Sequence, residues 1–259
     1  MVEYEESVLE SIPEVSQSFE ELGHIGEGGM GEVHMASDNL LRRKVAIKSL
    51  KKEQATPGAV KRFFREAQIT AQLDHPNIVP LYSVKRPEKK GENVSFVMKL
   101  IVGTTLKDII LSVRKKYKAN PKAILDSDLN LRSRLEFFLK ACDGISYAHE
   151  KRVVHRDLKP SNIMVGDYGE VYLMDWGIAK RMEDRDLKSE TMTIPGAIPP
   201  KKPRKLFGTL GYISPEQIED PPAVGEASDQ FSLGIILHEL ATLSPARTGS
   251  NTHMIDTAR

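Results

Sequence analysis

Cysteine is almost absent from this sequence: Cys142 is the single cysteine among 259 residues. One thiol excludes an intrachain disulfide, which fits a reducing compartment, so we expect a cytoplasmic chain. Leu135, Phe138, Cys142 and Ile145 follow helical spacing. We therefore expect Cys142 to pack as a small apolar side chain on a helix, with a reactive thiol as the alternative.

Long hydrophobic runs are absent as well. The longest apolar stretch, residues 231–243, contains His238 and Glu239 and falls short of the ~20 residues that cross a bilayer. The N-terminus has neither the basic region nor the apolar region of a secretory signal. We expect no membrane contact within this chain, so that any tethering depends on a region outside it.

Net charge is nearly absent too, because 37 Lys and Arg residues face 36 Asp and Glu residues. A net charge of +1 gives no field that favours nucleic acid or an anionic membrane as the main partner. The basic run at 201–205 has no interleaved aromatic residues, so we expect a solvated loop and no nucleic acid there. Residues 1–18 are acidic, and we expect a solvated tail.

The pattern of apolar residues divides the rest of the chain into two unlike parts. Short β-branched runs at 44–50 and 94–101 flank a helical stretch at 59–73, which predicts a small sheet with one helix. The second part has helical spacing at 131–149 and 228–243 and a hairpin at 163–175. The fold class is therefore α+β. The predicted apolar face of the helix at 59–73 consists of Val60, Phe64, Ala67 and Ala71.

A glycine-rich turn at residues 26–31 carries the first chemical signal. Missing side chains allow backbone N–H groups to approach phosphate oxygens. The same spacing fits a dinucleotide site or a plain flexible turn. A dinucleotide site needs a helix directly after the glycines, whereas residues 32–36 look extended and lead into a second strand. We therefore expect a hairpin at this position.

Two charged residues complement this turn. Strand alternation places Lys48 on the same face as Ala46, beneath the glycine loop, while Glu66 lies near the edge of the apolar face of the helix. An ion pair between Lys48 and Glu66 would orient the amine toward nucleotide phosphates. The alternatives are a lysine on the surface and a Glu66 that pairs with Arg62 or Arg65.

The strongest signal is His155-Arg-Asp157-Leu-Lys159-Pro-Ser-Asn162, followed by Asp175-Trp-Gly177. With the glycine loop, Lys48 and Glu66 in the same order, the chain resembles a Ser/Thr protein kinase of the Hanks type. Ser214-Pro-Glu216-Gln217 most resembles the bacterial branch. The resemblance runs from about Phe19 to Leu243. It implies a bilobal fold, with an N-lobe at 19–98, a C-lobe at 99–259, an activation segment at 175–216 and further helices beyond this chain.

The resemblance also assigns the chemistry. Asp157 would orient the substrate hydroxyl and accept its proton, Lys159 would neutralise the moving phosphoryl group, and Asn162 and Asp175 would hold Mg²⁺ or Mn²⁺. Lys159-Pro-Ser favours a Ser/Thr acceptor. Without the family, Val33, Ala46 and Met164 would be ordinary core residues. The ATP contacts implied are Ile25, Gly26, Glu27, Gly28, Gly29, Met30, Gly31, Val33, Ala46, Lys48, Met98, Lys99, Ile101 and Met164.

Regulation is expected in the segment at 175–216, which reads as a mobile loop. Trp176 replaces the more usual Phe, so the balance between active and inactive states is expected to shift. Arg156 would pair with a phosphorylated loop residue, and Thr209 resembles the threonine of a substrate pocket. The basic stretch at 113–122 looks like an insertion after a helix at 106–111. The candidate phosphorylation sites are Ser189, Thr191 and Thr193.

Two functional hypotheses follow from these residues. The first is an active kinase that transfers the γ-phosphate of ATP to Ser and Thr of protein substrates and, through self-association, to itself. The alternative is an ATP-binding pseudokinase that serves as a scaffold, or an inactive kinase fragment. Because Lys48, Asp157 and Asp175 are all retained, the sequence favours activity. We also expect the end of the chain to leave apolar surface on the helix at 231–243 exposed.

Overall fold

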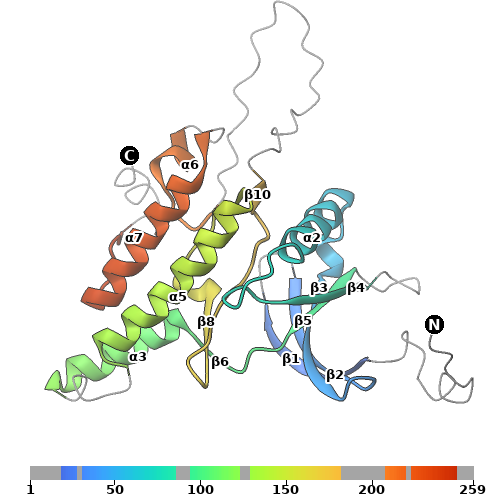
Figure 1. Ribbon diagram of the computed structural model, residues 1–259, viewed down its shortest axis with the longest axis horizontal. Helices are drawn as coiled ribbons and strands as arrows, with labels where there is room; N and C mark the ends of the chain where they lie inside the picture. The colour runs from blue at the N-terminus through green and yellow to red at the C-terminus, as the bar shows by residue number, and fades with distance from the viewer. Residues whose placement is uncertain are drawn as a thin grey trace, which may run out of the picture. The chain divides into compact units, whose positions relative to one another are not determined.

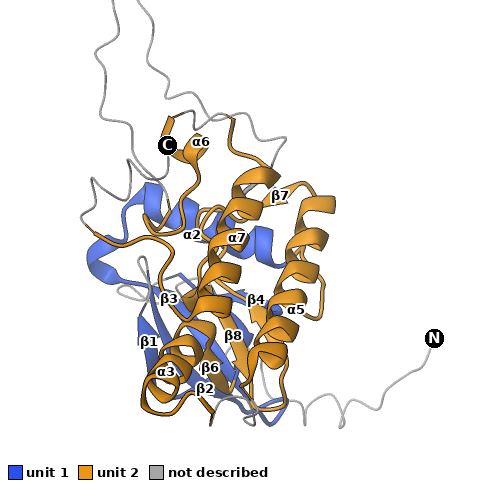
Figure 2. Ribbon diagram, turned by 90° about the vertical axis from the view of Figure 1, so that its left-hand side faces the viewer, with its two compact units in different colours: residues 1–71, 79–101 blue, residues 72–78, 102–259 orange. Residues whose placement is uncertain are grey.

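The computed structural model describes residues 19–27, 31–85, 94–122, 129–181, 208–219 and 223–249. The chain divides into two compact units, coloured separately in Figure 2. The first comprises Met1–Ala71 and Val79–Ile101, and the second comprises Gln72–Ile78 and Val102–Arg259. One unit is built on a sheet and the other mainly on helices, which confirms the predicted α+β class. The predicted boundary between residues 98 and 99 stays a prediction.

The first unit is an antiparallel sheet covered by one long helix (Figure 1). Its strands run in the order β1-β2-β3-β5-β4, and the helix is α2, Pro57–Thr70. Buried apolar side chains of β3, β5 and α2 form the core between sheet and helix. A short 3-10 turn, η2 at Lys52–Gln54, precedes α2. The strands are β1 Phe19–Glu27, β2 Gly31–Asp38, β3 Arg43–Leu50, β4 Leu81–Lys85 and β5 Ser95–Lys99.

The buried face of α2 differs from the predicted one. Phe63 is fully buried, whereas Phe64, which we expected in the core, is 39% exposed. The ring of Phe63 lies 4.9 Å from the ring of Phe96 on β5, and this contact sets the rotation of the helix. As a result, Glu66 lies within the buried face instead of at its edge. The buried residues of α2 are Ala59, Phe63, Glu66, Ala67, Ile69 and Thr70.

The second unit is mainly helical, with α5 and α7 packed side by side (Figure 1). The helices predicted at 131–149 and 228–243 are confirmed, and so is the hairpin, which turns between Gly166 and Glu170. The helices are α3 Leu106–Ala119, α5 Leu131–Glu150, α6 Pro215–Glu219 and α7 Glu226–Thr242, with η3 at Pro160–Asn162. The strands are β6 Gly103–Thr105, β7 Val153–Val154, β8 Ile163–Gly166, β9 Val171–Leu173 and β10 Lys180–Arg181.

Helix α3 continues through most of the basic stretch at 113–122, so the predicted end of the helix at residue 111 was wrong, while the insertion relative to the family stays a prediction. Val113 is buried on the same face as Leu106, Ile109 and Ile110. That face continues the helical period, and Lys and Arg are good helix formers. Lys116 and Lys118 also lie in the last turn, where positive charge favours the helix dipole.

The buried residues of helix α7 lie along one side of it, and little of its apolar surface is exposed. Among the described residues, Leu237 is the one large apolar side chain of this helix in the exposed class. Apart from Leu237, the exposed apolar surface expected on the helix at 231–243 is not found among the described residues. A search of the described residues finds no helix that is both long and apolar enough to cross a membrane.

Candidate active site

A buried ion pair joins β3 to α2 in the first unit. The Nζ atom of Lys48 lies 2.5 Å from Oε1 of Glu66, and the two residues are 8% and 3% exposed. Lys48 faces α2 because alternation in β3 turns it to the helix-covered side of the sheet. The alternative of a surface lysine is wrong, and Glu66 binds Lys48 as expected.

Strand register places several predicted ATP contacts on the same face as Lys48. Val33 of β2 lies opposite Lys48, and Ala46 lies opposite Met98 of β5. Residues opposite one another in an antiparallel pair share a face. Ala46 is buried, while Val33 and Met98 are half-buried. This face therefore combines apolar surface with one buried ammonium group.

The glycine turn is described only at its two ends, since Gly28, Gly29 and Met30 lie outside the described residues. At Gly31, a Cβ atom would lie 2.6 Å from the carbonyl oxygen of Ser49, so the close approach of β3 requires glycine. At Gly26, a Cβ atom would have no neighbour within 4 Å. Packing among the described residues therefore explains Gly31 and leaves Gly26 without a packing reason.

Other predicted ATP contacts have partners of their own. Glu27 lies 2.8 Å from Nζ of Lys51, and this hydrogen bond lowers the pKa of the Glu27 carboxyl. The N–H of Lys99 donates to the carbonyl of Pro80 at 3.0 Å, so a backbone contact to adenine at this residue would use its carbonyl. Ile25 is exposed and Ile101 is half-buried, while Met164 is half-buried on β8 of the second unit. Their contacts to ATP stay predictions.

Three side chains form a closed hydrogen-bonded triangle in the second unit. The hydroxyl of Thr209 donates to Oδ1 of Asp157 at 2.7 Å, and Nζ of Lys159 donates to Oδ2 of Asp157 at 2.7 Å. Nζ of Lys159 also donates to the Thr209 hydroxyl at 2.9 Å. Each group fixes the other two, so the Asp157 carboxylate has a defined orientation. This is the geometry needed of a group that positions a substrate hydroxyl.

Asn162 and Asp175 lie beside this triangle. The Asn162 amide nitrogen donates to the Asp157 carbonyl at 2.9 Å, so its amide oxygen is the atom left for a metal. The Met174 N–H donates to the Asn162 carbonyl at 2.9 Å, which places the next residue, Asp175, near Asn162. Among the described residues, no cluster of three or more His, Cys, Asp or Glu is arranged to hold a metal. One Asp and one Asn fit Mg²⁺ that takes its remaining ligands from phosphate and water.

A buried carboxylate holds the backbone that leads into Asp157. Asp229 of α7 is fully buried, and its oxygens accept hydrogen bonds at 2.8 Å from the N–H groups of His155 and Arg156. Nε2 of His149 also lies 2.8 Å from Asp229. A buried carboxylate without such partners would be costly. The sequence signal for this contact is an acid among the apolar residues of a helix, a signal that Asp229 shares with Glu239.

Comparison with known proteins fits this geometry. Residues 19–258 match the model of the protein kinase domain. The chain belongs to the protein kinase family. It is 35% identical over 245 residues to the serine/threonine-protein kinase PknD of Protochlamydia amoebophila, covering 92% of this chain and 24% of that protein.

Further relatives of the kinase are also bacterial. PknD of Chlamydia muridarum is 37% identical over 246 residues, which cover 88% of this chain and 25% of the relative. PknD of Chlamydia caviae is 37% identical over 233 residues, with 88% and 24% covered. These matches confirm the resemblance to bacterial Ser/Thr kinases. The chain spans about a quarter of the length of the curated relatives that it matches.

In this kinase, Trp176 stands directly after Asp175 and is 1% exposed. Its ring lies 4.5 Å from the ring of His155. The indole Nε1–H is buried, and no acceptor lies within hydrogen-bond distance of it in the part of the chain that the structure describes. The indole therefore contributes apolar contact at the cost of an unsatisfied donor.

The predicted regulatory residues divide into two groups. The Thr209 hydroxyl binds Asp157 and the Arg156 N–H binds Asp229, whereas Ser189, Thr191 and Thr193 lie outside the described residues. The pairing of Arg156 with a phosphorylated residue stays a prediction. The segment at 175–216 is not a loop throughout. Near its start β10 pairs with β7, and near its end Ser232 and Arg247 donate to the carbonyls of Tyr212 and Ile213.

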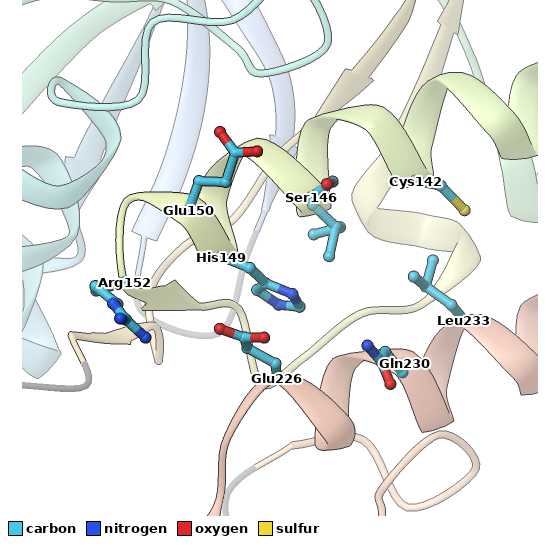
Figure 3. Close-up of a pocket in the computed structure, with 9 residues that line it drawn as sticks. Cys142, Ser146, His149, Glu150, Arg152, Glu226, Gln230 and Leu233 are labelled. Carbon is cyan, nitrogen blue, oxygen red and sulfur yellow. The ribbon is translucent and has the colours of Figure 1, made fainter.

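Cys142 lines a pocket of about 470 Å³ between α5 and α7 (Figure 3). It is half-buried, and burial, together with Asp143, raises the pKa of its thiol to about 11. A thiol with such a pKa is protonated at neutral pH and is a poor nucleophile. The prediction that Cys142 packs as a small apolar residue fits this environment. The pocket is also lined by Ile145, Ser146, His149, Glu150, Arg152, Glu226, Gln230 and Leu233.

Proposed function

We propose that this kinase domain transfers the γ-phosphate of ATP to Ser and Thr hydroxyls of proteins, including its own chain. The observation that carries the proposal is the triangle of Asp157, Lys159 and Thr209 beside Asn162. Such a triangle orients a carboxylate toward an incoming hydroxyl and keeps a cation next to it. The PknD relatives bear the name serine/threonine-protein kinase, which supports the choice of acceptor.

The roles of the side chains follow from their surroundings. Asp157 accepts the hydrogen bond of the substrate hydroxyl and takes its proton as the hydroxyl oxygen bonds to the γ-phosphorus of ATP. The bond between that phosphorus and the bridging oxygen breaks in the same transfer, and ADP leaves. Lys159, which lies 2.7 Å from Asp157, offsets the negative charge that moves with the phosphoryl group. Asn162 and Asp175 supply oxygens for Mg²⁺ or Mn²⁺, which would shield the phosphate charge.

The first unit supplies nucleotide-binding residues. Lys48 is held by Glu66 with its ammonium group fixed, as expected of a lysine that binds the α- and β-phosphates. Gly26 has open space where a side chain would stand, which suits a turn that phosphate approaches closely. Val33, Ala46 and Met98 offer an apolar face for adenine. A scaffold would require none of these groups to be kept together, so the pseudokinase alternative has no observation in its favour.

The proposal is tested with radiolabelled ATP and a peptide mixture that contains Ser, Thr and Tyr acceptors. We expect label on Ser and Thr, dependent on Mg²⁺ or Mn²⁺, and a loss of about 100-fold or more in the Asp157→Asn variant. Asp143→Asn, which changes an exposed aspartate of α5, is the matched control and should keep full activity. Equal transfer by wild type and Asp157→Asn would contradict the proposal.

Autophosphorylation provides a second arm of the same test. Transfer between two copies makes the initial rate per molecule rise with protein concentration, whereas transfer within one copy does not. We propose transfer between copies, through transient self-association. Cytoplasmic location and the absence of membrane contact within this chain stay predictions.

A further inference from the structure

Gln217 of α6 is a buried polar residue that the chemistry above does not use. It is 4% exposed, and both ends of its amide are engaged. Oε1 accepts hydrogen bonds from the N–H of Ser214 at 3.1 Å and from the Ser214 hydroxyl at 3.2 Å. Nε2 donates to the carbonyl of Arg156 at 2.9 Å. One side chain thus bridges the loop at 208–217 and the catalytic loop.

The carbonyl that Gln217 binds belongs to a strained residue. Arg156 has a φ of 71°, a conformation that is unfavourable for a non-glycine residue and persists only where its surroundings fix it. Two side chains do so from opposite ends of the residue. Asp229 accepts from the Arg156 N–H at 2.8 Å, and Gln217 donates to the Arg156 carbonyl. That carbonyl belongs to the peptide group between Arg156 and Asp157. Gln217 therefore fixes the orientation of the peptide group that leads into Asp157.

The loop at 208–217 contacts the catalytic loop at both of its ends. At one end, the Thr209 hydroxyl binds the Asp157 side chain. A Cβ atom on Gly208, whose φ is 111°, would lie 3.2 Å from the Arg156 carbonyl and 3.3 Å from Nε2 of Gln217. The chain therefore approaches this hydrogen bond so closely that glycine is required beside it.

We propose that Gln217 is a positioning residue for phosphoryl transfer, which couples the folded loop at 208–217 to the orientation of Asp157 through the Arg156 carbonyl. The inference rests on the proposed kinase function. Both ends of the Gln217 amide bind the protein itself, so its loss should lower kcat for peptide phosphorylation and leave the KM for ATP unchanged. A residue that only stabilised the fold would instead reduce the active fraction and the melting temperature together.

The test variant is Gln217→Glu, which keeps the size of the side chain and the acceptor for Ser214. An ionised carboxylate cannot donate to the Arg156 carbonyl, whereas a protonated carboxyl can. We expect kcat to fall about tenfold at neutral pH, as for one lost buried hydrogen bond, and the deficit to shrink toward acid pH. The Met side chain of Gln217→Met can neither ionise nor donate to the Arg156 carbonyl, so this variant should show a kcat deficit that does not change with pH.

The surrounding ionisable groups are common to wild type and variants. They are Arg156, Asp157 and Lys159 of the catalytic loop, Asp229 of α7 and Glu216 and Glu219 of α6. The ratio of variant to wild-type kcat at each pH therefore isolates the new carboxyl. Gln54→Glu, on the exposed turn η2 of the first unit, is the matched control and should have a ratio of one throughout.

The outcomes separate this inference from the proposed function. Wild type without activity would refute the kinase proposal itself. If wild type is active, two results would overturn the role of Gln217. The ratio of Gln217→Glu kcat to wild-type kcat could stay at one, or it could stay low without recovering at acid pH. If that variant does not fold, Ser214→Ala is measured, which removes one of the two donors to Oε1. We expect kcat about two- to threefold lower with an unchanged KM for ATP, and an unchanged kcat would overturn the inference.

Discussion

Removal of one partner from the Lys48–Glu66 pair should destabilise the protein far more than removal of both. The two groups are 2.5 Å apart and almost fully buried, so Lys48→Met leaves the Glu66 carboxylate in a low-dielectric site without its ammonium partner. Loss of one partner of a buried pair costs about 3–5 kcal/mol, whereas replacing both by apolar residues is often neutral. We therefore expect Lys48→Met to lower the free energy of unfolding by about 3 kcal/mol or more.

The assay is urea denaturation of wild type, Lys48→Met, Glu66→Leu and the double variant, without nucleotide. The double variant should lie within about 1 kcal/mol of wild type, which gives a large coupling energy between the two positions. Arg132 and Glu136, an exposed pair on α5, form the control cycle, with a coupling energy of about 0.5 kcal/mol or less. Additive losses at Lys48 and Glu66 would refute the buried pair.

Three further outcomes are expected. Trp176→Phe should change the free energy of unfolding, measured by urea denaturation, by less than about 1 kcal/mol, because the lost contact is offset by removal of an unsatisfied N–H. A loss of ~3 kcal/mol would contradict this. Cys142, with a thiol pKa of about 11, should react with a thiol reagent at about pH 8 at least about 100-fold more slowly than free cysteine, and equal rates would contradict its burial. Burial raises the pKa of Glu239 above 4.5, so its contribution to stability is full below that value and is lost as the pH rises through the folded-state pKa. Glu239→Gln should therefore stabilise the protein at about pH 8, and this gain in stability should vanish near pH 4.5. Thermal melts across pH measure it, and a gain in stability that does not depend on pH would argue against a raised pKa.

The chemistry of the candidate site could be predicted because its residues stand in short motifs. Asp157, Lys159 and Asn162 lie within one loop, so local sequence keeps them together wherever that loop folds. Lys48 and Glu66 lie on a strand and a helix whose patterns could be read, but those patterns left the partner of Glu66 open, and the structure decides for Lys48.

The features that could not be predicted depend on contacts between distant segments. Phe63, and not Phe64, packs between α2 and the sheet because its ring contacts Phe96, which lies far along the chain. The bridge from Gln217 to the Arg156 carbonyl joins residues that no local pattern connects. The error at α3 had another cause, since a run of basic residues was read as a break although Val113 continues the buried face.

The most direct test of the central claim measures transfer and nucleotide binding in the same samples. For wild type and Asp157→Asn, the phosphorylation rate of a Ser/Thr peptide and the dissociation constant of ATP with Mg²⁺ are determined together. The account predicts a rate about 100-fold or more lower in the variant, with an ATP affinity within about twofold of wild type, because Asp157 acts on the acceptor hydroxyl. Transfer that persists in Asp157→Asn at the wild-type rate would contradict it.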